Sequence, residues 1–420
     1  MKIILVLLLF FILFAFKIPI LIHSAVIGGL LSLFFIFYNG YTYKLKRLLS
    51  LFNIRIMINL NFGFFLVLFF PTIYGTYDYS MMKSLFSQFV TLNLCSFYCV
   101  LIYGYCESRN KNLFMEINKY IFHVFIIQAV IIFVALIFPS IKNIIIYFHR
   151  GDINVLDALN IGYSGLRNNA LSGTLYFGLA IVYALANLII LFHINNNGFS
   201  YKKLILFIII NISGLTVGRF SLVYLLVIPV FLMGNKNLAN KTAFIFRRAI
   251  MSLGVIVALF TIAISTIDKV NIVYNKTFYP YVFEMYDNYI NTGTASTAST
   301  DRLETMFPDL SIETILEGDG KYTSNGSYYG NSDVGYVRNI YFGGILFMMY
   351  FLLSPLLILW PMFKYKRIIN NYNVRYLGLA ILMMTYISHF KGEVSGFAIG
   401  YQSLLYIYCF SYYLYCESNK

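Results

Sequence analysis

Long runs of apolar residues, separated by short polar segments, extend along almost the whole chain. Each run holds about 14 to 22 residues, and a helix of roughly 20 residues crosses a bilayer core of about 30 Å. The runs are Ile3–Phe16, Ile18–Tyr38, Ile56–Ile73, Leu85–Tyr105, Tyr120–Pro139, Leu171–Phe192, Leu204–Val217, Phe220–Met233, Ile250–Ile267, Ile340–Trp360, Tyr376–Phe390 and Val394–Tyr415. The pattern predicts an all-α polytopic membrane protein with about 12 transmembrane helices, or about 11 if residues 1–40 form one helix, in a single domain over residues 1–420.

The composition agrees with this class. Of 420 residues, 60% are hydrophobic and 11% are charged, and the mean hydropathy is +0.74, whereas soluble domains carry about a quarter charged residues. The formal net charge of +14 arises from Lys and Arg in the short loops between alternate pairs of runs, which lie in the cytoplasm in membrane proteins. This bias predicts cytoplasmic N- and C-termini and indicates topology rather than nucleic-acid binding.

Arg219 is the one charged residue in the apolar run from Leu204 to Met233. A single helix over this run would be about 45 Å long, too long for a bilayer core of about 30 Å. It would also place every later basic loop on the outer side. The sequence therefore predicts a helix break at Gly218–Arg219, below the outer surface, where the second half-helix directs its N-terminal N–H groups at an anion site. The alternative is a side chain that reaches the outer interface and meets water.

Two segments predicted on the outer side are longer than ordinary connections. The first covers residues 140–170 and contains Arg150 and Arg167, and the second covers residues 268–339. Loops of such length are typically functional. A capping-box spacing in the second loop predicts a short amphipathic helix from Arg302 to about Leu316.

The end of the long loop is rich in turn residues and tyrosines. Tyr322, Tyr328, Tyr329 and Tyr336 stand among Gly, Ser and Asn residues. Tyrosines in such a setting suit stacking on sugar rings and hydrogen bonding to hydroxyl groups. The alternative is a tyrosine belt at the membrane interface.

Several kinds of chemistry find no support in the sequence. The cysteines lie in or at the inner ends of predicted helices and imply no disulfide framework, zinc site or surface nucleophile; they are Cys95, Cys99, Cys106, Cys409 and Cys416. The histidines have no metal-ligand spacing, and no Gly-rich phosphate loop with Lys indicates ATP binding. Glu317-Gly-Asp319 could chelate a divalent ion with a diphosphate, but a Gly-rich turn is favoured. We therefore expect no cofactor and no metal.

Arginine is the side chain that remains for chemistry on the outer side. The residues are Arg150, Arg167, Arg219, Arg302 and Arg338. Guanidinium groups bind phosphates bidentately and keep their charge in proteins. Near an outer leaflet, a diphosphate carried on a lipid is the ligand that this set indicates.

Three features, taken in order, resemble the Wzy-type O-antigen polymerases. GLRNNALSGTLYFG places Arg167 and Gly178 in an Arg-x10-Gly spacing similar to that of the family's loop. Val217-Gly-Arg219-Phe-Ser221 resembles the serine-arginine motif at the family's helix break. The long outer loop then ends in SDVGYVRNIYFGGILF, which resembles the family's loop end. The resemblance is to the architecture of nearly the whole chain and to short motifs.

The resemblance implies a GT-C-like glycosyltransferase of the bacterial inner membrane that needs no metal. Such an enzyme joins oligosaccharide repeat units into O-antigen at the periplasmic face during lipopolysaccharide biosynthesis. Donor and acceptor would both be glycans linked to undecaprenyl diphosphate. A chain-length regulator protein would be a further partner, and nucleic acid would not be one.

Together with side-chain chemistry, the resemblance suggests a role for each candidate residue. We expect Arg219 and Arg302 to stabilise the charge of the leaving diphosphate, and Arg167 and Arg338 to hold a donor or acceptor phosphate. Asp333 is the expected general base, with His389 as the second candidate near Lys391, and Tyr336 is expected to contact sugar. Other readings stay open: Asp333 could cap a turn, and Arg302 could pair with an acid on its own helix.

Two other functions remain open at this point. An O-antigen ligase of the same superfamily moves the glycan onto the lipid A core. The His-Asn pair common in those ligases is replaced here by Ser332–Asp333, a departure that disfavours the ligase and leaves the base open. A flippase or secondary transporter for lipid-linked oligosaccharides also has about twelve helices. It would show internal repeats and charges within several helices, and the sequence has neither pattern.

Overall fold

The computed structural model describes most of the chain. The described residues are 1–18, 23–149, 169–174, 176–196, 198, 200–234, 261, 265–266, 268–294, 296–324, 327–365, 368–369, 372–395 and 398–419. Most of the predicted helix Ile250–Ile267 and most of the outer loop 140–170, including Arg150 and Arg167, lie outside these residues.

Helices dominate the N-terminal half of the chain. Their bounds are α1 Lys2–Phe14, α2 Ser24–Tyr38, the 3-10 helix η1 Thr42–Leu49, α3 Leu51–Ile73, α4 Ser80–Ser108, α5 Leu113–Ile137, α6 Pro139–Ile146, α8 Tyr176–Asn196, α9 Tyr201–Val217, the 3-10 helix η2 Arg219–Val227 and α10 Ile228–Met233. Residues 1–40 form two helices, so the prediction of a helical pair in this segment is confirmed.

The long loop of residues 268–339, predicted on the outer side, and the C-terminal helices follow. They comprise α12 Asp268–Val273, the π-turn η3 Tyr274–Phe278, α13 Tyr279–Thr292, α14 Ala298–Glu304, α15 Ile312–Leu316, β1 Thr323–Ser324, β2 Ser327–Tyr328, the 3-10 turn η4 Tyr329–Asn331, α16 Gly335–Tyr365, β3 Ile368–Ile369, β4 Tyr372–Asn373, α17 Val374–His389 and α18 Ile399–Ser418. The strands form two antiparallel hairpins, with Thr323 opposite Tyr328 and Ile368 opposite Asn373. The described chain is thus all-α apart from these short ladders.

Five of the described helices are long and apolar enough to cross a membrane, judged by length and composition: α3, α4, α5, α8 and α16. Shorter apolar helices are α1, α2 and the continuous η2–α10 segment. The structure therefore has the character of a membrane protein, as the apolar runs predict. The total of about 12 crossings, the GT-C architecture and the side on which each loop lies stay predictions.

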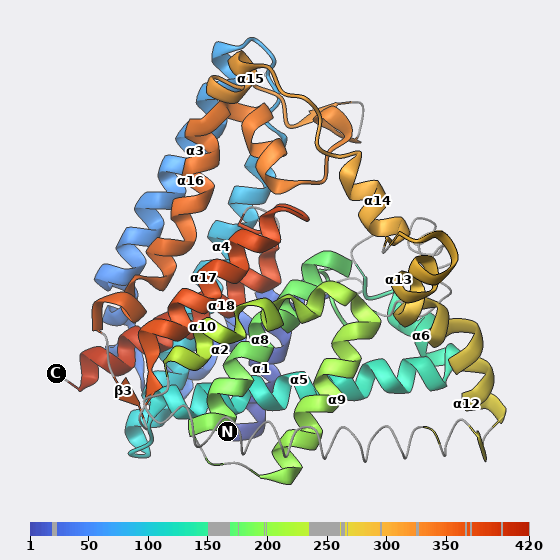
Figure 1. The fold of residues 1–420 in the computed structure, drawn as a ribbon. Coiled ribbons are helices and arrows are strands. Elements are labelled where there is room, and N and C mark those ends of the chain that lie inside the picture. The colour runs from blue at the N-terminus through green and yellow to red at the C-terminus, as the bar shows by residue number, and fades with distance from the viewer. Residues whose placement is uncertain are drawn as a thin grey trace.

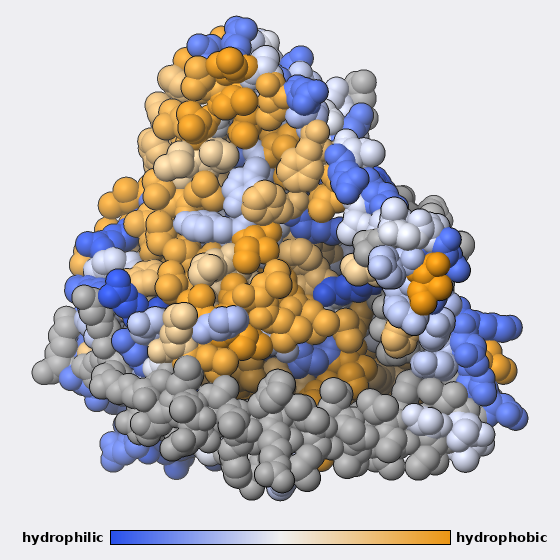
Figure 2. Space-filling model, viewed as in Figure 1, coloured by the Kyte–Doolittle hydropathy of each residue, from blue (hydrophilic) through white to orange (hydrophobic). Residues whose placement is uncertain are grey.

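The helices are arranged around α8 and α18. Every residue of α18 from Gly400 to Leu414 is buried, and α8 is buried on nearly all faces. By contrast α3 lies at the periphery beside α16 and exposes an apolar face, with Ile58 63% and Phe65 54% accessible (Figure 1). Apolar side chains cover this arm in Figure 2, which suits contact with lipid tails.

The long loop extends over one side of the helices. α15 packs on α16 at the tip of the α3–α16 arm, and α14 leads from there towards α13 and α12 on the opposite side of the molecule (Figure 1). Within α16 the helical geometry breaks at Gly343 and Gly344. Gly344 has a φ of 59°, which favours glycine, and a Cβ at this position would collide with the backbone of Leu316 and Glu317. This close approach seats α15 on the arm.

Candidate functional site

An open cleft of about 340 Å³ lies between the apolar helices and the long loop of residues 268–339, within the size range of small-ligand sites, which is about 300 to 1,000 Å³. Its lining residues are Tyr176, Phe177, Ala180, Val217, Gly218, Arg219, Phe220, Glu284, Met285, Thr297, Thr300, Arg302, Leu303, Met306, Asp333 and Lys391. Figure 2 shows a hollow between the apolar body and the lobe that carries α12 to α14. Three of the lining side chains are cationic and two are carboxylates.

Arg219 is positioned by a break between two helices. α9 ends at Val217, Gly218 has an extended backbone, and η2 begins at Arg219. The backbone N–H of Ser221 donates to the carbonyl of Gly218 at 2.9 Å, which fixes the start of η2. The break predicted from loop charge and helix length is confirmed. A 3-10 helix rises about 2 Å per residue, compared with about 1.5 Å in an α-helix. The residues of η2 therefore span a longer distance than they would as an α-helix.

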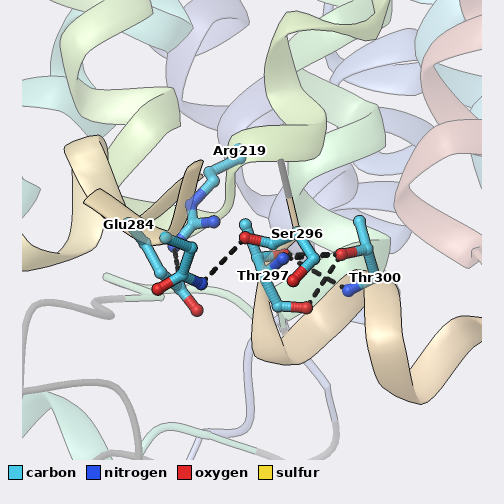
Figure 3. Close-up of polar contacts among 6 residues, drawn as sticks. Arg219, Glu284, Ser296, Thr297 and Thr300 are labelled. Carbon is cyan, nitrogen blue, oxygen red and sulfur yellow. Dashed lines mark hydrogen bonds and ion pairs between the residues drawn. The ribbon is translucent and has the colours of Figure 1, made fainter. Parts of the chain in front are cut away.

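The guanidinium of Arg219 forms an ion pair with the carboxylate of Glu284, through Nη2 and Oε2. Figure 3 shows Arg219 extending from η2 towards Glu284 on α13. The side chains are 33% and 28% accessible, so the guanidinium has both an anionic partner and access to the cleft. Sequence reasoning missed Glu284. A single acid in a tyrosine-rich helix of a loop gives no local sign that it meets an arginine 65 positions earlier.

The loop side of the cleft is shaped by the start of α14. Thr297 caps this helix: the N–H of Thr300 donates to Thr297 Oγ1 at 3.2 Å, and the N–H of Thr297 donates to Thr300 Oγ1 at 2.7 Å. Asn288 Nδ2 of α13 donates to the carbonyl of Ser296 at 2.9 Å and links α13 to the start of α14. Arg302 in the last turn of α14 faces the cleft.

The predicted helix from Arg302 to about Leu316 is wrong in its bounds. α14 begins earlier, at Ala298, and ends at Glu304, while α15 is a separate helix from Ile312 to Leu316. The reciprocal Thr297–Thr300 cap starts the helix before the Asp301–Glu304 pair does, and Pro308 prevents its continuation. The consequence is that Arg302 ends a helix rather than beginning one.

Asp333 reaches the same cleft from the far end of the loop. It follows η4, and its neighbour Ser332 is buried and donates its hydroxyl to the carbonyl of Met306 at 2.7 Å. Lys391, in the turn after α17, lines the cleft as well. The structure thus brings together Arg219, Arg302 and Asp333, three residues singled out from the sequence, although they are far apart along the chain.

The other predicted residues either do not line the cleft or lie outside the described chain. Arg338 is only 4% accessible and stacks on Tyr322 and Tyr328, with 4.4 and 3.5 Å from its guanidinium carbon to the ring centroids. The hydroxyl of Tyr336 donates to the carbonyl of Tyr386 at 2.8 Å. Neither side chain lines the cleft, and their phosphate and sugar roles stay predictions. Arg167 lies outside the described residues.

His389 belongs to a buried polar group beneath the turn that carries Lys391. His389 is 1% accessible, its Nε2 lies 3.1 Å from Ser395 Oγ, and its Nδ1 lies 3.7 Å from Glu393 Oε1. Asn339 Nδ2 donates to the other oxygen of Glu393 at 2.6 Å. These contacts stabilise the segment around the turn, and His389 does not line the cleft, so a catalytic role of His389 would have to be exerted indirectly.

Asp78 attaches the long loop to the α3–α4 connection. Its Oδ2 accepts the backbone N–H groups of Tyr322 and Thr323, each at 2.7 Å. Burial favours the neutral carboxyl, but the hydrogen bonds from Thr323, Ser80 and Tyr322 outweigh it and lower the pKa of Asp78 below 3.8. The ionised carboxylate therefore holds the β1–β2 hairpin at neutral pH.

Asp78→Asn is expected to loosen this attachment by about 1 to 2 kcal/mol, since the charge-assisted bonds are lost at a partly exposed site. Because the folded-state pKa is lowered, the stabilisation is complete above the unfolded value and is lost as the pH falls through the folded value. Amide exchange of Tyr322 and Thr323 should be flat from pH 5 to 8 after correction for the intrinsic rate. It should rise in Asp78→Asn but not in Asp309→Asn, an exposed acid of the same loop. Equal protection in Asp78→Asn would contradict the anchoring role.

Among the described residues, no three His, Cys, Asp or Glu side chains come together as a metal site. The chain matches no model of a known protein family. Curated protein sequences and solved structures give no significant match either.

Proposed function

We propose that the protein is a membrane glycosyltransferase that polymerises lipid-diphosphate-linked oligosaccharide repeat units, an O-antigen polymerase of the bacterial inner membrane. One observation carries the proposal: Arg219, at a helix break, shares a cleft with Arg302 and Asp333 of the long loop. Such a cleft offers fixed positive charge for a diphosphate and a carboxylate for a hydroxyl group. The resemblance of the motifs to Wzy-type polymerases supports the same reading.

In the proposed reaction the acceptor hydroxyl oxygen attacks C1 of the donor sugar. The bond between C1 and the diphosphate oxygen breaks, and the lipid diphosphate leaves with the bonding electrons. The hydroxyl proton passes to the carboxylate of Asp333, which is accessible in the cleft. Negative charge gathers on the leaving diphosphate, and Arg219 and Arg302 lie where they can stabilise it electrostatically.

Arginine suits this role better than lysine. Its planar fork binds two phosphate oxygens at once and it stays protonated at any physiological pH. Lys391 adds a third cationic side chain to the cleft lining. The carboxylates of Glu284 and Asp333 offset two of these three charges, so the lining side chains keep a formal charge of +1 (three cations minus two carboxylates), which favours an anionic ligand.

Purified protein in lipid nanodiscs, incubated with lipid-diphosphate repeat units from the same bacterium, should yield a ladder of longer lipid-linked glycans. No ladder from protein that is folded and supplied with both substrates would contradict the proposal. A gene deletion separates the related ligase: loss of a polymerase leaves one repeat unit on the lipid A core, whereas loss of a ligase leaves bare core. Transport of unextended glycan across vesicles, with no ladder, would indicate the flippase instead.

A further inference from the structure

The ion pair between Arg219 and Glu284 joins the packed helices to the long loop of residues 268–339. Arg219 projects from the break between α9 and η2, and η2 packs on α8 and α9. Glu284 projects from α13 in the long outer loop. Both side chains line the cleft that we assign to the diphosphate, and Figure 3 shows them directed at one another.

A carboxylate and a phosphate make the same contact with a guanidinium group. Each offers oxygens in the plane of the N–H fork. Glu284 contacts Nη2 of Arg219, so a phosphate that binds both Nη groups of the fork competes with Glu284 for that nitrogen, and the two anions would also repel each other at this distance. The substrate meets a cation that already holds an anion of the protein.

We propose that Glu284 is an internal competing anion, which yields Arg219 to the substrate diphosphate and reclaims it to release the lipid diphosphate product. The inference rests on the proposed function. It assigns to Glu284 a role in the binding and release steps rather than in proton transfer.

The packing indicates which partner moves. The start of η2 is fixed by the Ser221–Gly218 hydrogen bond and by its packing on α8 and α9. Among the described elements, α13 packs mainly on the adjoining η3, and its Tyr286 and Tyr289 are 58% and 59% accessible. A shift of α13 can thus withdraw Glu284 without disturbing the packed membrane helices.

A competing carboxylate beside Arg219 would speed release of the lipid diphosphate product. When the bond to C1 breaks, the diphosphate changes from a diester into a monoester and gains negative charge. The product would then bind three cationic side chains more strongly than the donor does, and turnover would slow. A carboxylate tethered beside Arg219 competes at high effective concentration and offsets this gain.

The test is the binding of inorganic pyrophosphate to the purified full-length chain, measured by calorimetry at fixed ionic strength. Glu284→Gln should bind pyrophosphate about fivefold more tightly, the effect expected for loss of a partly exposed competing pair. In an Arg219→Ala background the same change should have no effect. With lipid-linked substrates, KM and kcat should both fall in Glu284→Gln, because the product leaves more slowly.

Asp287→Asn is the matched control. Asp287 lies on the same helix and accepts from the hydroxyl of Tyr279 at 3.2 Å, and its replacement removes the same charge from α13. If Glu284→Gln binds pyrophosphate no more tightly than the wild type, or if Asp287→Asn tightens binding equally, the inference is wrong while the proposed function stands. If neither the wild type nor Glu284→Gln binds pyrophosphate, the cleft is not a diphosphate site and both proposals fail. A loss of kcat with unchanged pyrophosphate affinity would make Glu284 a proton acceptor instead.

Discussion

Arg219→Ala is expected to reduce polymer formation at least about a hundredfold. Removing one preorganised donor to a developing charge costs about 10² to 10³ in rate in well-studied enzymes. Here the change also removes the ion-pair partner of Glu284, so the formal charge of the lining side chains falls from +1 to 0 and the attraction for the diphosphate weakens. The measurement is the banding of surface polysaccharide in a deletion strain that carries the variant, where only the one-repeat band should remain.

Arg219→Lys separates two components of the same interaction. Lysine keeps the positive charge but loses the planar fork that binds two oxygens. We expect partial activity, reduced about tenfold, with short polymers. Full activity of the lysine variant would contradict bidentate binding and leave only a point charge. Normal polymer in Arg219→Ala would contradict the proposed function itself.

A matched control excludes a general effect of losing an arginine. Arg109 lies at the C-terminal end of α4 and does not line the cleft. Arg109→Ala should retain the wild-type banding pattern. Amounts of each variant in the membrane, measured by immunoblot, show whether a lost ladder reflects lost protein.

The features of the site that follow from one segment of chain could be predicted from the sequence. The break before Arg219 follows from the length of the apolar run and from the charge of the flanking loops, and both are local quantities. The helices agree with the apolar runs, because burial in lipid or in the core requires the same composition. The ends of the helices differ from the ends of the apolar runs. For example, α4 extends beyond the run Leu85–Tyr105 through polar residues to Ser80 and Ser108.

The parts that depend on distant contacts could not be predicted. Glu284 meets Arg219 only because the long loop folds back over the helix break. Arg338 is predicted to hold a phosphate because it is a cation in a segment expected on the outer side, and that role stays a prediction. The contacts of its guanidinium with the rings of Tyr322 and Tyr328 could not be predicted, because the β1–β2 hairpin brings these rings to it. No spacing in the sequence distinguishes an arginine that stacks on tyrosine rings from an arginine that only binds a ligand.

Asp333 and His389 are the two candidates for the general base, and the structure places them in different surroundings. Asp333 is partly accessible and lines the cleft, whereas His389 is 1% accessible, contacts Glu393 and Ser395 and does not line the cleft. A base must come within hydrogen-bond reach of the acceptor hydroxyl. The cleft geometry therefore favours Asp333.

Asp333→Asn is expected to reduce kcat about 10² to 10⁴-fold, the usual contribution of a general base, while the affinity for pyrophosphate is unchanged or slightly higher. Asn has nearly the same shape and can still cap a turn, so a purely structural role predicts near-normal turnover. His389→Gln should cost less in kcat, because it acts only through the turn that carries Lys391. Asp309→Asn, an exposed acid of the same loop, should leave kcat unchanged. If His389→Gln abolishes turnover and Asp333→Asn does not, the proton must leave through the buried His389–Glu393 pair, and the assignment of the base is reversed.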